Sequence, residues 1–147
     1  MNQKGRSGMT NKPQRIIIDT NLWVSFLISG NVKLEDLLFA QKVSLIFSEE
    51  LVQEFVSVTG RPKFARYFNL QTVEELLSVI HEVATFVQVT TTVSICRDPK
   101  DDFLLALALD SNADVLITGD SDLLELEQVG GTRIMTLSSF LDTQYYA

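Results

Sequence analysis

Two aspartates of this chain each follow an apolar run that has the pattern of a buried β-strand. Asp19 follows the isoleucines of 16–18, and Asp120 follows the run 115–118 after one glycine. In an open parallel sheet, the carboxyl ends of the strands form the edge where ligands bind. An ionised carboxylate at that edge needs a helix N-terminus, a cation or a metal ion beside it. If these two strands are neighbours, Asp19 and Asp120 flank one crevice, and we predict a metal site there.

Further acids stand at the starts of helices or beside the core. Glu54 borders the apolar stripe of a helix expected over 49–59, and both Asp101 and Asp102 directly precede an apolar helix that starts at Phe103. Taken singly, each acid is explained by helix capping or by the helix dipole. Together they favour a shared site, because the helix from Phe103 leads into the second of the two strands.

Clustered carboxylates repel one another, and a hard divalent cation such as Mg²⁺ or Mn²⁺ removes that repulsion. Such an ion takes oxygen ligands at ~2.0 to 2.1 Å and keeps several waters. The metal lowers the pKa of a bound water and orients it toward a phosphate, so that the water acts as the nucleophile. This hydrolysis requires no histidine or cysteine nucleophile.

Strands and helices alternate along the chain, which predicts one α/β domain. The three isoleucines of 16–18 need cover on both faces, as in a parallel sheet between helices. Expected strands cover 15–18, 43–47, 87–89, 115–118 and 133–135. Expected helices cover 22–27, 34–40, 49–59, 72–85, 103–109, 123–126 and 138–141, with a small helix or ordered loop over 61–68. Expected helix caps are Ser48, Thr72 in a capping box with Glu75, and Ser138.

Composition excludes several classes of protein. A chain of 147 residues with 46% hydrophobic and 21% charged residues is typical of one globular domain. The net charge of −7 argues against a general basic surface for nucleic acid, but it does not exclude a metal-dependent nuclease. One cysteine and one histidine provide neither a disulfide framework nor a Cys/His zinc site, and they fit a reducing cytoplasm.

The ends of the chain and its apolar runs suggest no membrane association. No stretch approaches 18 uninterrupted apolar residues, and residues 1–14 lack the apolar middle of a signal peptide. We therefore expect a disordered tail over 1–14 and a single domain over 15–147.

Five short motifs stand in order between residues 15 and 141. They are Ile16-Ile-Ile-Asp19-Thr-Asn21, Glu50-Leu-Val-Gln-Glu54, Arg61-Pro-Lys-Phe64, Arg97-Asp-Pro-Lys-Asp-Asp102 and Thr118-Gly-Asp120-Ser-Asp122. With these motifs the chain resembles the PIN-domain nucleases, in particular the single-domain toxins of bacterial and archaeal toxin–antitoxin pairs. The resemblance implies a three-layer α/β/α sandwich with a central parallel five-stranded sheet.

The resemblance also implies a Mg²⁺ or Mn²⁺ site that hydrolyses RNA to 5′-phosphate and 3′-hydroxyl ends. Carried onto this chain, the catalytic metal ligands are Asp19, Glu54, Asp102 and Asp120, with Asp122 as a peripheral ligand. Asp101 competes with Asp102, and we choose Asp102 because its spacing to the Thr118-Gly-Asp120 segment looks like that of the family. Residues expected to orient carboxylates or water, unless they serve only as turn and cap residues, are Thr20, Asn21 and Thr118.

Five cations near these motifs are candidates for phosphate contacts: Arg61, Lys63, Arg66, Arg97 and Lys100. Contacts of this kind position RNA without reading its sequence. Alternatively, these five cations form a solvated charged face without a role in binding RNA.

These observations predict a cytoplasmic, metal-dependent endoribonuclease that is the toxin component of a toxin–antitoxin pair. Its expected partners are RNA, an antitoxin protein and a second copy of the chain. A non-catalytic PIN-like scaffold for protein or RNA is the alternative. A phosphatase of the haloacid dehalogenase type also starts from a strand-end aspartate, but it needs a second aspartate two residues later, where this chain has Asn21.

Overall fold

The computed structural model describes residues 12–29 and 43–146. The helix expected over 34–40 and most of the tail expected over 1–14 lie outside the described residues. The strands are β2 (Gln14–Ile18), β3 (Val43–Phe47), β4 (Thr85–Phe86), β5 (Val115–Ile117), β6 (Gln128–Val129) and β7 (Thr132–Met135). The α-helices are α1 (Thr20–Ser29), α3 (Glu49–Thr59), α4 (Leu70–Val83), α5 (Asp102–Ser111), α6 (Ser121–Leu124) and α7 (Leu137–Tyr146). Two 3₁₀ turns are η1 (Pro62–Phe64) and η2 (Pro99–Asp101).

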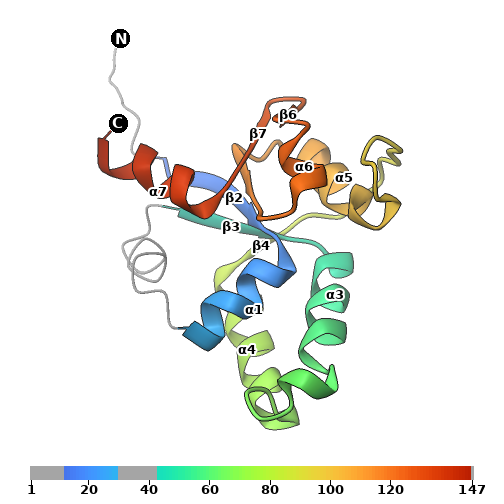
Figure 1. Ribbon diagram of the computed structural model, residues 1–147, viewed down its shortest axis with the longest axis vertical. Helices are drawn as coiled ribbons and strands as arrows, with labels where there is room; N and C mark the ends of the chain where they lie inside the picture. Colours follow the sequence, from blue (N-terminus) through green and yellow to red (C-terminus); the bar gives the residue numbers. More distant parts are fainter. Residues whose placement is uncertain (1–11, 30–42, 147) are drawn as a thin grey trace.

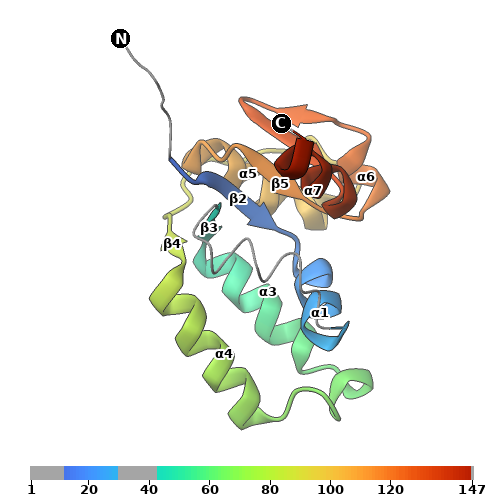
Figure 2. The ribbon, with the colours of Figure 1, turned by 90° about the vertical axis from the view of Figure 1, so that its left-hand side faces the viewer.

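Helices cover both faces of one central sheet. Figure 1 and Figure 2 show α1, α3 and α4 on one side of the sheet and α5, α6 and α7 on the other. The prediction of a three-layer α/β/α sandwich is therefore confirmed. The strand-end aspartates lie where β2 and β5 give way to the helices that follow them.

The sheet has the strand order β4-β3-β2-β5-β7-β6 within the described residues. The first five strands of this order are parallel, and β6 pairs antiparallel with β7. The expected count of five strands is wrong, because the sheet has a sixth strand at its edge. Gly130, with φ at +54°, and Gly131 form a tight turn that folds β6 back on β7.

The core forms on both faces of the central strands. Ile16, Ile17 and Ile18 are at most 1% exposed, so the predicted two-sided cover of this strand is confirmed. Three leucines of α5 are equally buried, as its apolar sequence predicts: Leu104, Leu105 and Leu107. Among the described helices, none is long and apolar enough to cross a membrane.

The third strand lies earlier than expected. It is β4, Thr85–Phe86, rather than 87–89, because α4 ends at Val83 and the chain enters the sheet at once. The Val87 N–H continues the pairing with β3 by donating to the Phe47 carbonyl at 2.9 Å.

Two helix caps also differ from the expected residues. The side chain of Asn69 caps α4 by accepting a hydrogen bond of 2.8 Å from the Thr72 N–H, so Thr72 is not the cap. The Thr136 hydroxyl accepts a hydrogen bond of 3.1 Å from the Ser139 N–H at the start of α7, in the place expected of Ser138. Ser48 caps α3 as predicted.

Candidate functional site

Asp19 is the buried carboxylate of the site. It lies between β2 and α1, and 9% of its surface is exposed. Its Oδ2 accepts a hydrogen bond of 2.8 Å from the Thr118 hydroxyl, and its Oδ1 accepts a longer one of 3.4 Å from the Asn21 N–H. Burial raises the pKa of Asp19 and the charge of Asp120 adds to the rise, although the two hydrogen bonds oppose it. Neither ion pair within the described ranges involves Asp19, so no cationic side chain there neutralises it.

Parallel pairing of β2 with β5 brings Asp19 and Asp120 to the same edge of the sheet. Ile18 lies opposite Ile117, and the Asp19 N–H donates to the Ile117 carbonyl at 3.0 Å. Thr118 links the two acids, because its hydroxyl donates to Asp19 and accepts from the Asp120 N–H at 3.0 Å. The prediction that these two strands are neighbours is confirmed.

Asp101, at the end of η2, is the third acid of this group. Burial raises its pKa to about 7, and further causes are a hydrogen bond with the Asp120 side chain and the charges of Asp120, Asp19 and Asp98. Two carboxyl groups form a hydrogen bond only when one of them holds a proton. The Oδ2 atom of Asp101 is buried and has no hydrogen-bond partner among the described residues. Asp19, Asp101 and Asp120 therefore form one mutually repelling group, which we call the acid triad.

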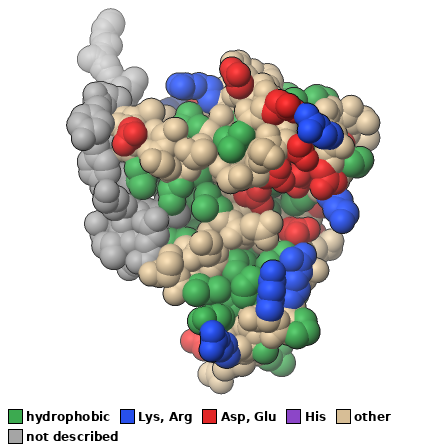
Figure 3. Space-filling view, viewed as in Figure 1, with side chains coloured by type: hydrophobic (Ala, Val, Ile, Leu, Met, Phe, Trp, Pro, Cys, Tyr) green, Lys and Arg blue, Asp and Glu red, His purple; other side chains and the backbone are tan. Residues whose placement is uncertain are grey.

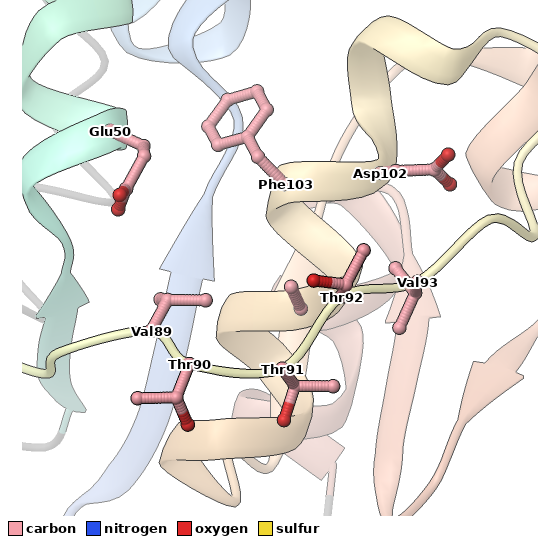
Figure 4. Close-up of a pocket in the computed structure, with 9 residues that line it drawn as sticks. Glu50, Val89, Thr90, Thr91, Thr92, Val93, Asp102 and Phe103 are labelled. Atoms are coloured by element: carbon pink, nitrogen blue, oxygen red, sulfur yellow. The ribbon is translucent and has the colours of Figure 1, made fainter.

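Asp102 has different contacts. Its Oδ1 atom accepts hydrogen bonds from the backbone N–H groups of Ile95 at 3.2 Å and Cys96 at 2.9 Å. It also borders a hollow of about 280 Å³ between α3 and α5, shown in Figure 4. Asp101 interacts with Asp120, whereas the described hydrogen bonds of Asp102 are with backbone N–H groups. The choice of Asp102 as a metal ligand stays a prediction.

The other two acids expected at the metal lie outside the triad. Glu54 is half-buried on α3, and no hydrogen bond or ion pair found in the described part of the chain joins it to the triad. The Asp122 N–H donates to Asp120 Oδ1 at 2.8 Å, which caps α6. The Asp122 carboxylate lies 3.7 Å from the Arg97 guanidinium. Both residues stay predicted ligands, and the described contact with the triad is made by the backbone N–H of Asp122, not by a carboxylate of either residue.

The three polar residues expected to support the site differ in their contacts. Thr118 holds the Asp19 carboxylate through its hydroxyl. Thr20 is 2% exposed, and its hydroxyl has no hydrogen-bond partner among the described residues. The Asn21 side chain is exposed, and the N–H of Asn21 is the group that contacts Asp19.

The candidate phosphate-binding cations fall into two groups. Arg61, Lys63 and Arg66 are exposed in and around η1, with Lys63 and Arg66 each 5.1 Å from the ring of the next residue. Lys100 is exposed on η2, whereas Arg97 is ion-paired with Glu125. Figure 3 shows the acidic side chains gathered on one part of the surface, with Lys and Arg side chains around its margin.

The chemistry of the acid triad fits a hard divalent cation. Its donors are carboxylate oxygens, which Mg²⁺ and Mn²⁺ prefer, and the buried unpartnered Oδ2 of Asp101 needs a positive partner. As they stand, no three or more His, Cys, Asp or Glu side chains of the described residues form a group that could hold a metal ion. The carboxylates would therefore have to move closer together when an ion binds.

Two contacts were not predicted from the sequence: that of Asp101 with Asp120 and that of Arg97 with Glu125. Pro99 was the available signal, since proline at the first position of a turn favours a short 3₁₀ segment that ends at Asp101. For Glu125 we find no signal in the sequence, because its partner Arg97 lies 28 residues away.

A family model, described as the PIN domain, matches residues 15–122. An uncharacterized protein of Methanocaldococcus jannaschii, MJ1680, is 31% identical over 116 residues, which cover 76% of this chain and 74% of that protein. The crystal structure of PAE2754 from Pyrobaculum aerophilum aligns with a TM-score of 0.54 over 92% of each chain, at 14% identity, so it supports the fold alone. Because the family match covers most of the chain and includes the whole acid triad, this chain belongs to the PIN domain family.

Proposed function

We propose that this protein is a metal-dependent endoribonuclease that uses Mg²⁺ or Mn²⁺ at the acid triad to hydrolyse RNA. PIN domains are generally metal-dependent nucleases, which supports a nuclease-like role. The observation that carries the proposal is that the Thr118 hydroxyl joins Asp19 to Asp120 at the edge of the sheet. A third acid, Asp101, has a buried carboxylate oxygen without a hydrogen-bond partner among the described residues. A group of this kind is costly to a folded protein unless a cation binds it.

The chain's own residues would prepare the site for hydrolysis. Asp19, Asp101 and Asp120 would hold the ion, which when bound supplies an acidified water and neutralises charge on the phosphate. Thr118 restrains the orientation of the Asp19 carboxylate by donating to Oδ2. Asp120 is fixed by its own cap on α6, so the triad acids from β2 and β5 stand on rigid elements.

The biological setting that we propose is a toxin–antitoxin pair, in which an antitoxin restrains the nuclease. The resemblance of the five motifs to single-domain toxins supports it. Expression of the chain with and without the product of a neighbouring open reading frame tests this: growth arrest that the neighbour relieves is expected. A chain that is harmless alone would contradict the toxin role while leaving the nuclease proposal to its own tests.

A scaffold without catalysis is the second candidate. It is favoured by the lack, among the described residues, of a group already arranged to hold a metal ion. The nuclease should cleave single-stranded RNA in Mg²⁺ or Mn²⁺, and this cleavage should stop in chelator. The scaffold should not cleave RNA under either condition. Cleavage that continues in excess chelator would contradict the proposed metal-dependent mechanism.

The adjacent aspartates of α5 and η2 provide a matched pair of variants. We expect Asp101→Asn to weaken Mn²⁺ binding by tenfold or more, roughly the effect of removing an important group at a metal site. Asp102→Asn should bind Mn²⁺ much as wild type does, because the Asn side-chain oxygen still accepts from the amides of Ile95 and Cys96. Calorimetric titration of both variants measures this. The reverse ranking would return Asp102 to the metal site, as the sequence-based choice has it.

The cations around η1 are expected to bind RNA phosphates. Replacing Arg61, Lys63 and Arg66 together with Ala should weaken RNA binding for all sequences and flatten its salt dependence by about 0.7 in logarithmic slope per lost contact. Cleavage at saturating RNA should change little. Arg133→Ala, which removes an exposed cation on β7, is the control. An unchanged salt slope in the triple variant would assign these residues to a solvated face.

A further inference from the structure

Arg97 connects the two segments that carry Asp101 and Asp120. It lies just before η2, which ends at Asp101, and its partners lie on and after α6, which Asp120 caps. Its Nη2 atom donates to both carboxylate oxygens of Glu125, at 2.9 and 2.8 Å, and its Nη1 atom lies 3.7 Å from Asp122 Oδ1. These are the two ion pairs found in the described part of the chain.

The contact opposes a repulsion within the triad. Asp101 ends η2 and Asp120 caps α6, so these two acids sit on the same two segments that Arg97 joins, and like charges placed there repel each other. The η2 segment is a single 3₁₀ turn, so it has few internal hydrogen bonds to resist this displacement. The Arg97 guanidinium attracts two acids outside the triad, Asp122 and Glu125, and so draws the two segments together.

The ion pair is of little use for overall stability. The Arg97 side chain is 69% exposed and that of Glu125 is 60% exposed, and pairs so exposed to water contribute little to the free energy of unfolding. The ion pair would have a larger effect on metal affinity, because a small shift of one ligand at a metal site changes affinity strongly.

We propose that Arg97 is a positioning residue that holds η2 against α6 through Glu125 and thereby keeps Asp101 and Asp120 close enough to share one divalent cation. This inference rests on the proposed function, since it assumes that the triad binds the cation. It replaces the expectation that Arg97 binds RNA phosphate, because its guanidinium already has one carboxylate partner on α6, Asp122, and one directly after it, Glu125.

Three roles of Arg97 predict different changes in Mn²⁺ affinity. If Arg97 positions the triad, both Arg97→Ala and Glu125→Gln weaken binding. If Arg97 acts only by its charge, Arg97→Ala strengthens cation binding, because a nearby positive charge is removed, while Glu125→Gln weakens it. If Arg97 serves RNA, neither variant changes Mn²⁺ affinity, and Glu125→Gln strengthens RNA binding by freeing the guanidinium.

The experiment is calorimetric titration of the full chain with Mn²⁺, without RNA. We expect Arg97→Ala and Glu125→Gln each to bind about tenfold more weakly than wild type. Arg97→Lys should restore part of the affinity, since lysine keeps the charge but offers a single nitrogen. The double variant should bind no more weakly than either single variant, because both remove the same contact. Melting temperatures in chelator should change little.

Glu82→Gln is the control for the loss of one negative charge far from the triad, because Glu82 is an exposed residue of α4. This variant should bind Mn²⁺ as wild type does. Tighter binding by Arg97→Ala, unchanged binding by Glu125→Gln, or fully additive losses in the double variant would each overturn the role of Arg97. Wild type that binds no Mn²⁺ would overturn the metal site itself, which separates the failure of the proposed function from that of this inference.

Discussion

Asp19→Asn is expected to abolish RNA cleavage and to leave the protein folded. The substitution removes the charge that would bind the cation most deeply, yet the Asn oxygen still accepts from the Thr118 hydroxyl. A neutral group at a position that is 9% exposed also avoids the cost of burying a charge. Initial rates on single-stranded RNA in Mg²⁺ and in Mn²⁺, together with circular dichroism and thermal unfolding, measure both parts.

Acids with cap or surface positions serve as controls for this loss. Glu49→Gln changes an exposed residue at the start of α3, and Asp98→Asn keeps an oxygen that accepts from the Lys100 N–H. Both variants should retain most of the wild-type rate. A comparable loss in either of them, or full activity in Asp19→Asn, would place the catalytic site elsewhere.

Wild-type protein is expected to be stabilised by Mg²⁺ or Mn²⁺ against thermal unfolding. An ion that binds the folded state alone adds about 2.7 kcal/mol when its concentration is a hundred times its dissociation constant. The same ions should stabilise Asp101→Asn much less, because the variant lacks one triad carboxylate. Unfolding is followed at constant ionic strength, with chelator as the reference, so that general screening does not contribute.

Without metal, the triad should make stability fall as pH rises. The pKa of Asp101 is about 7 in the folded protein against 3.8 ordinarily, so the folded state holds a proton that the unfolded state has lost between about pH 4 and 7. The free energy of unfolding contributed by this group is therefore fully present below about pH 4 and is lost as pH rises through about 7. Asp101→Asn should flatten this dependence and raise the melting temperature in chelator at pH 8.

If the acids serve only as helix caps, the variants should have lower melting temperatures than wild type in chelator. Loss of a cap costs roughly 0.5 to 2 kcal/mol, and asparagine is itself a good cap, so Ala variants should be melted beside the Asn variants. Wild type that ignores both metals, with every substitution at Asp19, Asp101 and Asp120 lowering the melting temperature, would contradict the shared site and favour the scaffold.

The sequence alone determined the α/β alternation, the buried central strand and the placing of two acids at strand ends. Consecutive isoleucines in 16–18 place apolar side chains on both faces of a strand. Other elements must therefore cover both faces of that strand, as they do in a sandwich. The acids Asp19 and Asp120 inherit their place from these strands. Family membership also follows from motifs of four to six consecutive residues, which can be identified without the tertiary structure.

The tertiary structure decided which further side chains lie near Asp19 and Asp120. A 3₁₀ turn advances three residues per turn against 3.6 for an α-helix, so the boundary between η2 and α5 sets the directions of Asp101 and Asp102, and hydrophobic periodicity cannot locate it to one residue. The pairing of Arg97 with Glu125 depends on how α6 packs beside the loop before α5. Such contacts join residues far apart in the chain, and their geometry exists only once the elements have packed.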